Sequence, residues 1–595
     1  MGAFDNGSGE GCITVSAPGK VLVAGGYLVL ERPNVGVVLA TTARFFTSVV
    51  WSENQAPCPP PAPVEEPGAL PERLHVMVES PQFRSVYWYD CIFYEDGRVP
   101  TLASSPEQAS NTFVERALTY VLGYLLEAGE AEAETDEGDE RVSVLRQAIQ
   151  DDRTLAIKLR ADNDFYSQMS QLSARGLPCT AEALATLPPF LECPVGADGA
   201  VVVTKTGMGS SAALISSLVG ALLAFFGAAQ LPCFDDSRTD EDPTGPEAES
   251  SPGINESLAL THNLAQACHC VAQGKVGSGF DVSAAVYGTH IYTRFSPSTL
   301  ADTLSAGDDK QQAPSATVAS DPASVQNDAA IPRPLQRITA CVRGPGGWDA
   351  HRGQLRLPSC FRLLMGDVCG GSTTPSMVRK VQAWRAEPST AAQAKEVWSS
   401  LGSTNSTIAE LLNNLALIAS ASAQTATEEG SRFEAGARIL AGLTSEKWAH
   451  LTESREAFGA KAFDQLIRLK AAFAQARRLL REMGELAGVS IEPPVQTRLI
   501  DATCSLPGLL CAGVPGAGGV DAVFAIVVHP DAEEGVRQLW ASWRVGGKGV
   551  QETEVVPASD RLGGGVTGYV CPLLLTASEG GLEGGMLLTR KLSWK

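Results

Sequence analysis

The chain has 595 residues, of which 44% are hydrophobic and 19% charged, proportions typical of a globular protein with room for two or more domains. Its formal net charge of −21 argues against a nucleic-acid partner, because such binding depends on neutralising phosphates with lysine and arginine. No apolar run approaches the roughly 18 residues of a membrane span, so we expect no membrane partner. The 14 cysteines are scattered, and the amino terminus lacks a basic start, so we expect a reduced, cytoplasmic compartment.

Short apolar runs predict strands, and longer amphipathic stretches predict helices. The final helix carries Phe463, Leu466 and Phe473 near one face, and Gly488 is its expected stop. The expected strands are residues 12–15, 21–24, 35–40, 45–51, 201–204 and 522–528, and the expected helices are residues 213–226, 257–273 and 454–486.

Four stretches are dense in proline, alanine, serine or acidic residues and bury too little apolar surface to offset the cost of ordering. We expect loops there, near residues 55–71, 127–140, 235–252 and 296–334. The last stretch is the expected boundary between an amino-terminal domain, residues 12–335, and a carboxyl-terminal domain, residues 336–595.

The segment from Lys205 to Ala213 is the most informative part of the sequence, because a glycine loop there lies between an expected strand and an expected helix. Gly207 and Gly209 let the backbone approach an anion, and the start of the following helix offers unpaired N–H groups. Ser210 and Ser211 add hydroxyls that can bind phosphate or a magnesium ion. The pattern favours a phosphate-binding loop over a simple capped turn.

A dinucleotide site is the alternative for this loop, because Gly207, Gly209 and Ala212 also match the Gly-x-Gly-x-x-Ala pattern. That pattern requires a second strand ending in an acidic residue about twenty positions further on. Here an apolar helix and an acidic loop follow instead, which weakens this interpretation.

Three other glycine-bearing segments contain candidate functional residues. Lys20 follows a Pro-Gly turn, and Asp281 follows the flexible segment that begins at Gly274. Residues 513–521 contain four glycines just before a strand. Taken singly, a surface lysine, a helix-capping aspartate and a tight bend explain these segments as well as a ligand site does.

Together and in this order, these segments resemble the motif set of the GHMP kinases, from about Ser16 to Val528. Residues 17–20 and 24–27, 262–266, 273–281, 366–368 and 370–373 resemble in particular the eukaryotic phosphomevalonate kinase branch of that family. The Gly-Gly-Tyr at residues 25–27 is specific, because most other members have Gly-Glu-His there.

The resemblance implies an α+β protein with the GHMP kinase fold: an amino-terminal two-layer α/β domain like that of ribosomal protein S5 and a smaller carboxyl-terminal α+β domain. It also implies ATP and Mg²⁺ as cofactors and transfer of the γ-phosphoryl group to phosphomevalonate. A monomer or a homodimer is compatible with it.

The resemblance assigns roles to individual residues. Lys20 and Asp281 correspond to the catalytic pair, and Ser210 and Ser211 to the magnesium ligands. His269 takes the place of the glutamate that binds magnesium in mevalonate kinases, which leaves the full ligand set of the metal open. The expected ATP-binding residues are Lys205, Gly207, Met208, Gly209, Ser210, Ser211 and Ala212; the expected substrate-binding residues are Lys275, Ser278, Gly279, Ser372 and Thr373; and the third glycine motif contains Gly516, Gly518 and Gly519.

An acceptor that is a phosphate monoester has a second pKa of about 6 and needs little deprotonation at neutral pH. We therefore expect Asp281 to orient groups and Lys20 to hold two anions together, so that loss of Lys20 is the more damaging. Three alternatives remain: a GHMP kinase acting on an alcohol, with Asp281 as a true base; a non-catalytic sensor of the same fold; and a dinucleotide oxidoreductase.

Overall fold

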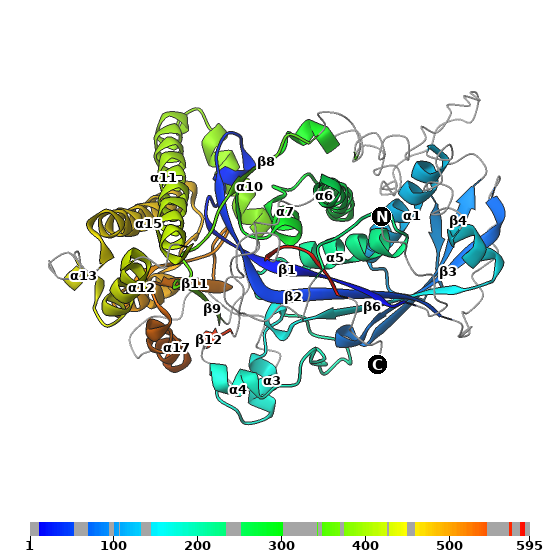
Figure 1. Ribbon diagram of the computed structural model, residues 1–595, viewed down its shortest axis with the longest axis horizontal. Helices are drawn as coiled ribbons and strands as arrows, with labels where there is room; N and C mark the ends of the chain where they lie inside the picture. The colour runs from blue at the N-terminus through cyan, green and yellow to red at the C-terminus, as the bar shows by residue number, and fades with distance from the viewer. Residues whose placement is uncertain are drawn as a thin grey trace, which may run out of the picture.

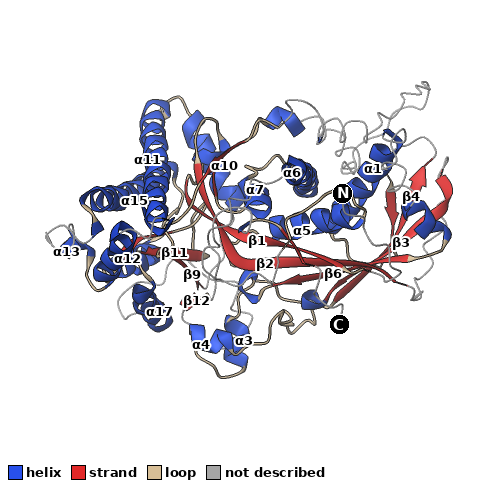
Figure 2. Cartoon of the chain, in the orientation of Figure 1, coloured by secondary structure: helices blue, strands red, loops and turns tan. Residues whose placement is uncertain are grey.

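The computed structural model describes two sheets with helices packed against them (Figures 1 and 2). The residues that it describes are 11–52, 69–94, 100–105, 107–131, 144–233, 252–300, 342, 348–368, 374–424, 428–448, 458–543, 570–573 and 584–589. The expected loops near 55–71, 127–140, 235–252 and 296–334 lie mostly outside these residues, and Ser372 and Thr373 lie wholly outside them.

The larger sheet has nine described strands in the order β13-β1-β2-β6-β3-β4-β5, with β7 paired to β2 and β8 paired to β7. Its pairings are antiparallel except for β3 with β6. The strands are β1 (Ile13–Ala24), β2 (Gly36–Ser52), β3 (Ala69–Ser80), β4 (Ser85–Tyr94), β5 (Thr101–Ala103), β6 (Thr154–Ala161), β7 (His290–Thr293), β8 (His351–Gln354) and β13 (Leu587–Thr589).

Helices cover one face of this sheet, with α5 central and in contact with β1, β2, α1 and α6 (Figure 1). Helix α5 is buried on nearly all sides, which explains why its sequence is almost uniformly apolar or small. The helices of this half are α1 (Thr112–Ala131), α3 (Met169–Ala174), α4 (Ala181–Ala185), α5 (Ser210–Phe225), α6 (Pro252–Gln273) and α7 (Phe280–Tyr287).

The smaller sheet has four described strands in the antiparallel order β10-β11-β9-β12. A group of helices that includes the long α11 and α15 packs beside it (Figure 2). The elements are β9 (Arg362–Val368), β10 (Leu509–Gly513), β11 (Ala522–Val527), β12 (Val570–Pro572), α10 (Thr374–Ala386), α11 (Ala391–Gln424), α12 (Glu428–Ala441), α13 (Ser445–Trp448), α15 (Ala460–Ala487), α16 (Pro494–Cys504) and α17 (Glu533–Ser542).

Most of the expected elements are present, often longer than predicted. The runs at 12–15 and 21–24 belong to one strand, β1, in which the register shifts between Pro18 and Lys20. Helix α15 ends where Gly488 adopts a left-handed conformation, as predicted, although residues 454–457 lie outside the described part. The strand predicted at 201–204 is wrong: Val201 makes only an isolated bridge to Val195, the Val202 N–H donates to the Pro194 carbonyl oxygen in a loop, and Val202 and Val203 are exposed.

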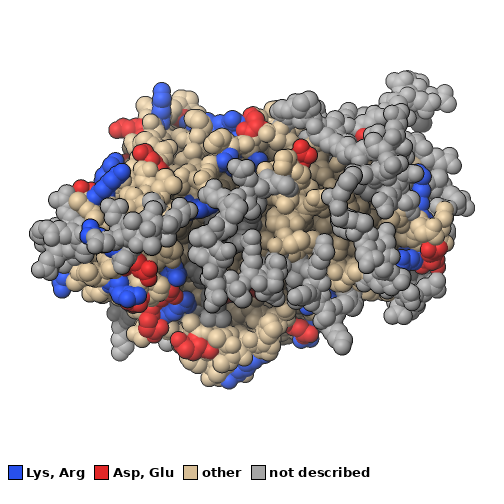
Figure 3. Space-filling model, viewed as in Figure 1, with Lys and Arg blue, Asp and Glu red and all other residues tan. Residues whose placement is uncertain are grey.

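The mixture of sheets and helices confirms the expected α+β class. The strands of the smaller sheet all follow residue 335, whereas β8 and β13 of the later half pair into the larger sheet. The division into domains at 335 and 336 stays a prediction. Among the described residues, no helix is long and apolar enough to cross a membrane. On the face drawn in Figure 3, the described basic and acidic side chains are interspersed.

Candidate active site

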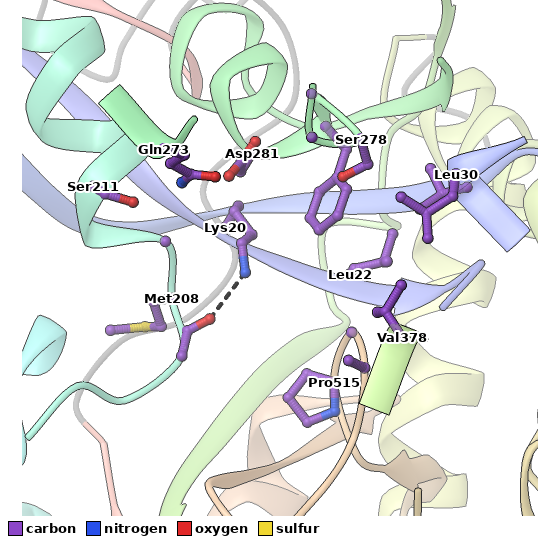
Figure 4. Close-up of a pocket in the computed structure, with 18 of the residues that line it drawn as sticks. Lys20, Leu22, Leu30, Met208, Ser211, Gln273, Ser278, Asp281, Val378 and Pro515 are labelled. Atoms are coloured by element: carbon purple, nitrogen blue, oxygen red, sulfur yellow. Dashed lines mark hydrogen bonds between the residues drawn. The ribbon is translucent and has the colours of Figure 1, made fainter. Parts of the chain in front are cut away.

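A cavity of about 720 Å³ lies between β1 of the larger sheet and residues 515–522, which lead into β11 of the smaller sheet (Figure 4). Its walls come from β1, from the loop before α5, from the end of α6 and the loop after it, from α10 and from residues 515–522. Segments more than 490 residues apart in the chain therefore share one site. The cavity brings together Lys20, the glycine loop and Asp281, which the sequence had singled out separately.

The loop before α5 has the geometry of an anion site. Gly207 and Gly209 adopt left-handed backbone conformations with φ of 80° and 76°. Gly209 caps α5, and its carbonyl oxygen accepts hydrogen bonds from the N–H groups of Ala212 and Ala213 at 3.1 Å. The N–H groups at the very start of the helix have no such intrahelical acceptor, and Ser210 and Ser211 line the cavity. The loop can therefore offer main-chain donors to a phosphate.

Lys20 ties β1 to this loop by two hydrogen bonds. Its main-chain N–H donates to the Met208 carbonyl oxygen at 3.0 Å, and its Nζ donates to the Gly207 carbonyl oxygen at 2.9 Å. Burial lowers the pKa of the Lys20 ammonium, and the charge of Asp281 partly offsets this effect. The arrangement places a positive charge at the mouth of the phosphate loop.

The absence of a side chain at Gly209 makes room for Lys20. A Cβ atom built on Gly209 would lie 2.9 Å from Lys20 Cε and 3.3 Å from its Cγ. Because the φ of Gly209 is also positive, any L residue there would be both strained and crowded. Gly209 thus leaves space for the Lys20 side chain and also adopts the left-handed conformation that the loop requires.

Asp281 lies in the first turn of α7, after Gly279. Its Oδ1 accepts a hydrogen bond from the Val282 N–H at 3.0 Å, and its side chain lines the cavity beside Lys20 (Figure 4). The helix-capping interpretation of Asp281 is wrong, because the N-cap of α7 is Gly279 and no side chain caps the helix. One carboxylate next to one ammonium gives the centre of the site a balanced charge.

A buried imidazole lines the cavity beside the phosphate loop. His269 Nε2 lies 3.2 Å from Ser211 Oγ and 3.0 Å from Gln273 Nε2. Burial lowers the pKa of His269, and the nearby Lys275 and Lys205 act in the same direction. Because Nε2 of a neutral ring carries one lone pair, the Gln273 amide and the Ser211 hydroxyl compete for the same acceptor.

Arg294 holds the loop between α6 and α7 in place. Its guanidinium donates to the carbonyl oxygens of Gly277 and Val276 at 2.8 to 3.1 Å and to that of Leu30 at 2.6 Å. Main-chain carbonyls therefore occupy most of the donors of this buried arginine, although it lines the cavity. We interpret it as a residue that positions the loop carrying Ser278 and leading to Asp281.

The glycine motif at residues 513–521 packs directly on the turn after β1. Gly516 donates from its main-chain N–H to the Leu22 carbonyl oxygen at 3.0 Å, and the Tyr27 hydroxyl donates to the Ala517 carbonyl oxygen at 2.7 Å. A Cβ on Gly26 would lie 2.3 Å from the Gly516 carbonyl oxygen. Tyr27 itself has a φ of 65°, which is costly for a residue with a side chain. The Gly-Gly-Tyr sequence thus forms the contact between the turn after β1 and the glycine motif at residues 513–521, and this contact is called the seam below.

Most of the predicted site residues line the cavity, and some do not. Ala212 and Gly519 are buried behind it, and the Met208 side chain is packed in the core, so only its main chain reaches the site. Ser372 and Thr373 lie outside the described residues. The predicted residues that line the cavity are Lys20, Lys205, Gly207, Met208, Gly209, Ser210, Ser211, Lys275, Ser278, Gly279, Asp281, Gly516 and Gly518.

Sequence reasoning missed several lining residues. Tyr27 belongs to the Gly-Gly-Tyr motif, but the sequence suggested no role for it. Arg294, Arg379 and Gln382 lie in segments with no recognisable pattern. Arg379 and Gln382 are on α10, which follows the string at 370–373. Nearness to that string was the one signal that could have indicated them.

No family model matches the chain. A relative from Arabidopsis thaliana, described as a peroxisomal phosphomevalonate kinase, is 35% identical over 90% of this chain and 93% of its own. A phosphomevalonate kinase of Aspergillus fumigatus is 31% identical over 89% of this chain and 90% of its own.

Among solved structures, the phosphomevalonate kinase of Streptococcus pneumoniae in complex with phosphomevalonate and AMPPNP superimposes with a TM-score of 0.44 and 13% identity, over 89% of this chain and 96% of that one. The likeness to the Arabidopsis and Aspergillus proteins extends over nearly the whole of both chains. On that sequence relationship, the chain belongs to the phosphomevalonate kinase family of GHMP kinases.

Proposed function

We propose that this protein transfers the γ-phosphoryl group of ATP to phosphomevalonate and releases ADP and diphosphomevalonate. The observation that carries the proposal is the convergence of the phosphate loop, Lys20 and Asp281 on one cavity in a chain of this family. Phosphoryl transfer needs positioning and charge neutralisation rather than covalent chemistry by the protein. A loop of main-chain donors beside an ammonium meets both needs.

Lys20 has the central role in this mechanism. The γ-phosphoryl group and the acceptor phosphate are both anions, and a positive charge between them reduces their repulsion. The bond from Lys20 Nζ to the Gly207 carbonyl oxygen fixes that charge at the loop. The acceptor oxygen attacks phosphorus, the bond from phosphorus to the β,γ-bridging oxygen breaks, and ADP leaves with the bond electrons.

Asp281 orients groups rather than removing a proton. The acceptor phosphate, with a second pKa of about 6, is mostly a dianion at neutral pH and needs no base. The negative charge of Asp281 raises the pKa of Lys20 and so stabilises the charged ammonium, which burial disfavours. An acceptor that was an alcohol would instead require Asp281 as a base.

Magnesium belongs to the proposal, because the cavity is lined by side chains with the oxygen atoms that this ion prefers. Mg²⁺ keeps several waters and needs only one or two protein oxygens besides the substrate phosphates. Ser210 and Ser211, the expected metal ligands, both line the cavity and would supply such oxygens, and the Asp281 carboxylate would supply a further one. When bound, the ion would neutralise the charge that develops on the phosphates.

The cytoplasm as compartment, and a monomer or a homodimer as assembly, are further proposals. The Arabidopsis relative is described as peroxisomal, which makes the compartment worth measuring directly. Imaging of the tagged full chain and sedimentation equilibrium test the two proposals. A peroxisomal pattern, or a species larger than a dimer, would overturn the corresponding one.

The test of the function is an assay of ATP consumption with magnesium, in which phosphomevalonate, mevalonate and homoserine are offered separately. We expect turnover with phosphomevalonate only. The K20A variant serves as the matched control and should be nearly inactive. Turnover with an alcohol would overturn the assignment of Asp281. Nucleotide binding without turnover would favour a sensor, and binding of NAD in place of ATP would favour an oxidoreductase.

A further inference from the structure

Two cysteines from distant parts of the chain meet outside the active-site cavity. Cys179 lies in the connection between α3 and α4, and Cys571 is the middle residue of β12, the last strand in the order of the smaller sheet. Figure 1 shows α3 and α4 close to β12. The two thiols are hydrogen-bonded to each other, and Cys179 packs against the apolar cluster that contains Cys571.

The two thiols differ in exposure and in charge environment. Cys571 is buried, whereas Cys179 is partly exposed. The hydrogen bond with Cys179, burial and the neighbouring carboxyl groups of Asp367 and Asp164 raise the pKa of the Cys571 thiol, which therefore keeps its proton. A thiol that donates a hydrogen bond stabilises negative charge on the sulfur that accepts it. Cys179 is thus the sulfur that a small oxidant can reach and that can attack it.

The segment that carries Cys179 supports the phosphate loop. The chain just before α3 is bonded to the chain just before that loop. The Ser167 N–H donates to the Thr204 carbonyl oxygen at 2.8 Å. The Thr206 Oγ1 donates to the Asp164 carbonyl oxygen at 2.6 Å. A displacement of α3 and the connection after it would therefore be transmitted to the residues that hold the phosphate loop.

The strand that carries Cys571 supports another wall of the cavity. Strand β12 pairs with β9, where Cys571 lies opposite Asp367, and β9 pairs in turn with β11. Residues 515–522, which lead into β11, line the cavity, and so does Val378 on α10, the helix that follows β9. A covalent bond between the two sulfur atoms would therefore join the supports of two walls.

We propose that hydroperoxides convert Cys179 and Cys571 into a reversible disulfide, and that this bond slows turnover by joining the two walls. The slowing of turnover rests on the proposed function, whereas the formation of the bond does not. A disulfide requires the sulfur atoms to lie about 2.05 Å apart, and a pair already in hydrogen-bonding contact has little distance to close. In a reducing compartment such a bond is transient, which suits a redox-sensing role.

The oxidation balances with one hydroperoxide, for which hydrogen peroxide is the probe. The Cys179 sulfur attacks one peroxide oxygen, so that an S–O bond forms, the O–O bond breaks, and the other oxygen leaves with the Cys179 proton as water. The Cys571 sulfur then attacks the sulfur of the Cys179 sulfenic acid. An S–S bond forms, the S–O bond breaks, and hydroxide leaves with the Cys571 proton as water. The two thiols lose two electrons, which reduce the peroxide.

The bond has two expected consequences. Relative movements of loops and domains limit the turnover of many enzymes, and a covalent link between the two supports restricts such movement. We therefore expect kcat to fall by at least about fivefold in the oxidised protein. Because the link also constrains the unfolded chain, Tm should rise.

The experiment treats the reduced full chain with hydrogen peroxide, blocks the remaining thiols with a maleimide and identifies linked peptides by mass spectrometry after digestion with trypsin. Trypsin releases Cys571 on the peptide 562–590. It releases Cys179 on the peptide 176–205, which also contains Cys193. The wild type should give a link between these two peptides, and dithiothreitol should reverse it.

Three variants assign the link to its two sulfur atoms. C179S and C571A each remove one of them, and C193A is the matched control, because Cys193 is buried and lies on the same peptide as Cys179. Under reducing conditions all three should turn over like the wild type, which shows that they fold. After peroxide, the wild type and C193A should lose activity and recover it with dithiothreitol, whereas C179S and C571A should keep it. If the buried C571A variant does not fold, C179S decides the matter.

Three results would overturn the proposal: no link between the two peptides in the wild type, a linked protein with full kcat, or equal inactivation of the wild type and C179S. The link is measured without turnover, so its failure differs from failure of the proposed function. A chain that forms the link but turns over no acceptor contradicts the reaction and supports the thiol pair. A chain that turns over phosphomevalonate but forms no link supports the reaction and contradicts the thiol pair.

Discussion

The two ends of the cavity are built in different ways. The phosphate end is one continuous loop that acts through main-chain groups, with Gly207 and Gly209 in left-handed conformations and α5 starting directly behind them. The other end, lined by Leu22, Leu30, Val378 and Pro515 and called here the acceptor end, combines β1, α10 and the loop at 515–518, which are far apart in the chain. Its walls are side chains such as Leu22 and Val378.

This difference decides what a substitution does at each end. A loop that binds through its backbone is sensitive to any change in its φ angles or in the space around it, and it tolerates few residues. A wall made of side chains from several elements can change its ligand by one substitution while the fold persists. We therefore expect losses of rate at the phosphate end and changes in KM at the acceptor end.

The largest effect should come from Lys20, which stands where the two ends meet. K20A removes the charge between two anions as well as the bond to the Gly207 carbonyl oxygen, so we expect kcat to fall roughly 10³-fold or more. D281A should cost less, roughly 10- to 100-fold, because the acceptor phosphate needs no base. Parallel measurement of kcat for both variants checks the order, and a much greater loss in D281A would show that Asp281 abstracts a proton.

The next largest effect tests how the phosphate loop makes room for Lys20. In G209A the new Cβ would lie 2.9 Å from Lys20 Cε, at a residue whose φ is 76°, so we expect kcat/KM to drop roughly 100-fold. G207A is the matched control: its φ is 80°, but a Cβ there meets no atom within 4 Å. It carries the backbone strain without the crowding and should lose clearly less. Equal losses in the two variants would mean that strain alone accounts for the effect.

The same contrast explains how much of the site could be predicted from the sequence. The phosphate loop was readable because its chemistry is local: glycines, two serines and a helix start follow one another along the chain. Lys20 and Asp281 were found through the order of several motifs rather than through their own surroundings. Arg294 could not be found, because it acts by binding carbonyl oxygens that only folding brings near it.

The fold was predictable to a similar extent. The long β1 and β2 and the helices α5 and α15 follow from apolar runs of the right period. The strand expected at 201–204 was wrong because an apolar run becomes a strand only where tertiary packing favours it, whereas Val202 and Val203 are exposed and Val201 makes only an isolated bridge. The pairing of β13 with β1 joins the two ends of the chain, and no local pattern carries such information.

A smaller effect is expected at the seam, where Tyr27 contacts the glycine motif. Y27F removes the hydrogen bond from the Tyr27 hydroxyl to the Ala517 carbonyl oxygen. We expect the KM for the acceptor to rise about 3- to 10-fold and the free energy of unfolding to fall by about 1 kcal/mol. Y94F is the control, because the Tyr94 hydroxyl bonds Thr101 Oγ1 at the far strands β4 and β5. It should lose similar stability without a kinetic change. An unchanged KM in Y27F would show that the seam does not position the acceptor end.

The smallest effect on catalysis, but a measurable one on stability, concerns Asp367 in β9, the strand that precedes α10. Burial raises the pKa of its carboxyl to about 7, although a hydrogen bond with Ser167 opposes the shift, and its Oδ2 has no hydrogen-bond partner among the described residues. A carboxyl whose pKa is raised on folding stabilises the native state fully below its unfolded pKa near 4, and this contribution is lost as the pH rises toward 7. D367N removes that dependence, so relative to the wild type it should gain stability by at most about 1.4 kcal/mol per pH unit between pH 4 and 7. Urea unfolding of both proteins at pH 5 and pH 8 measures the difference, and a gap that does not widen with pH would show that Asp367 is ionised in the native state.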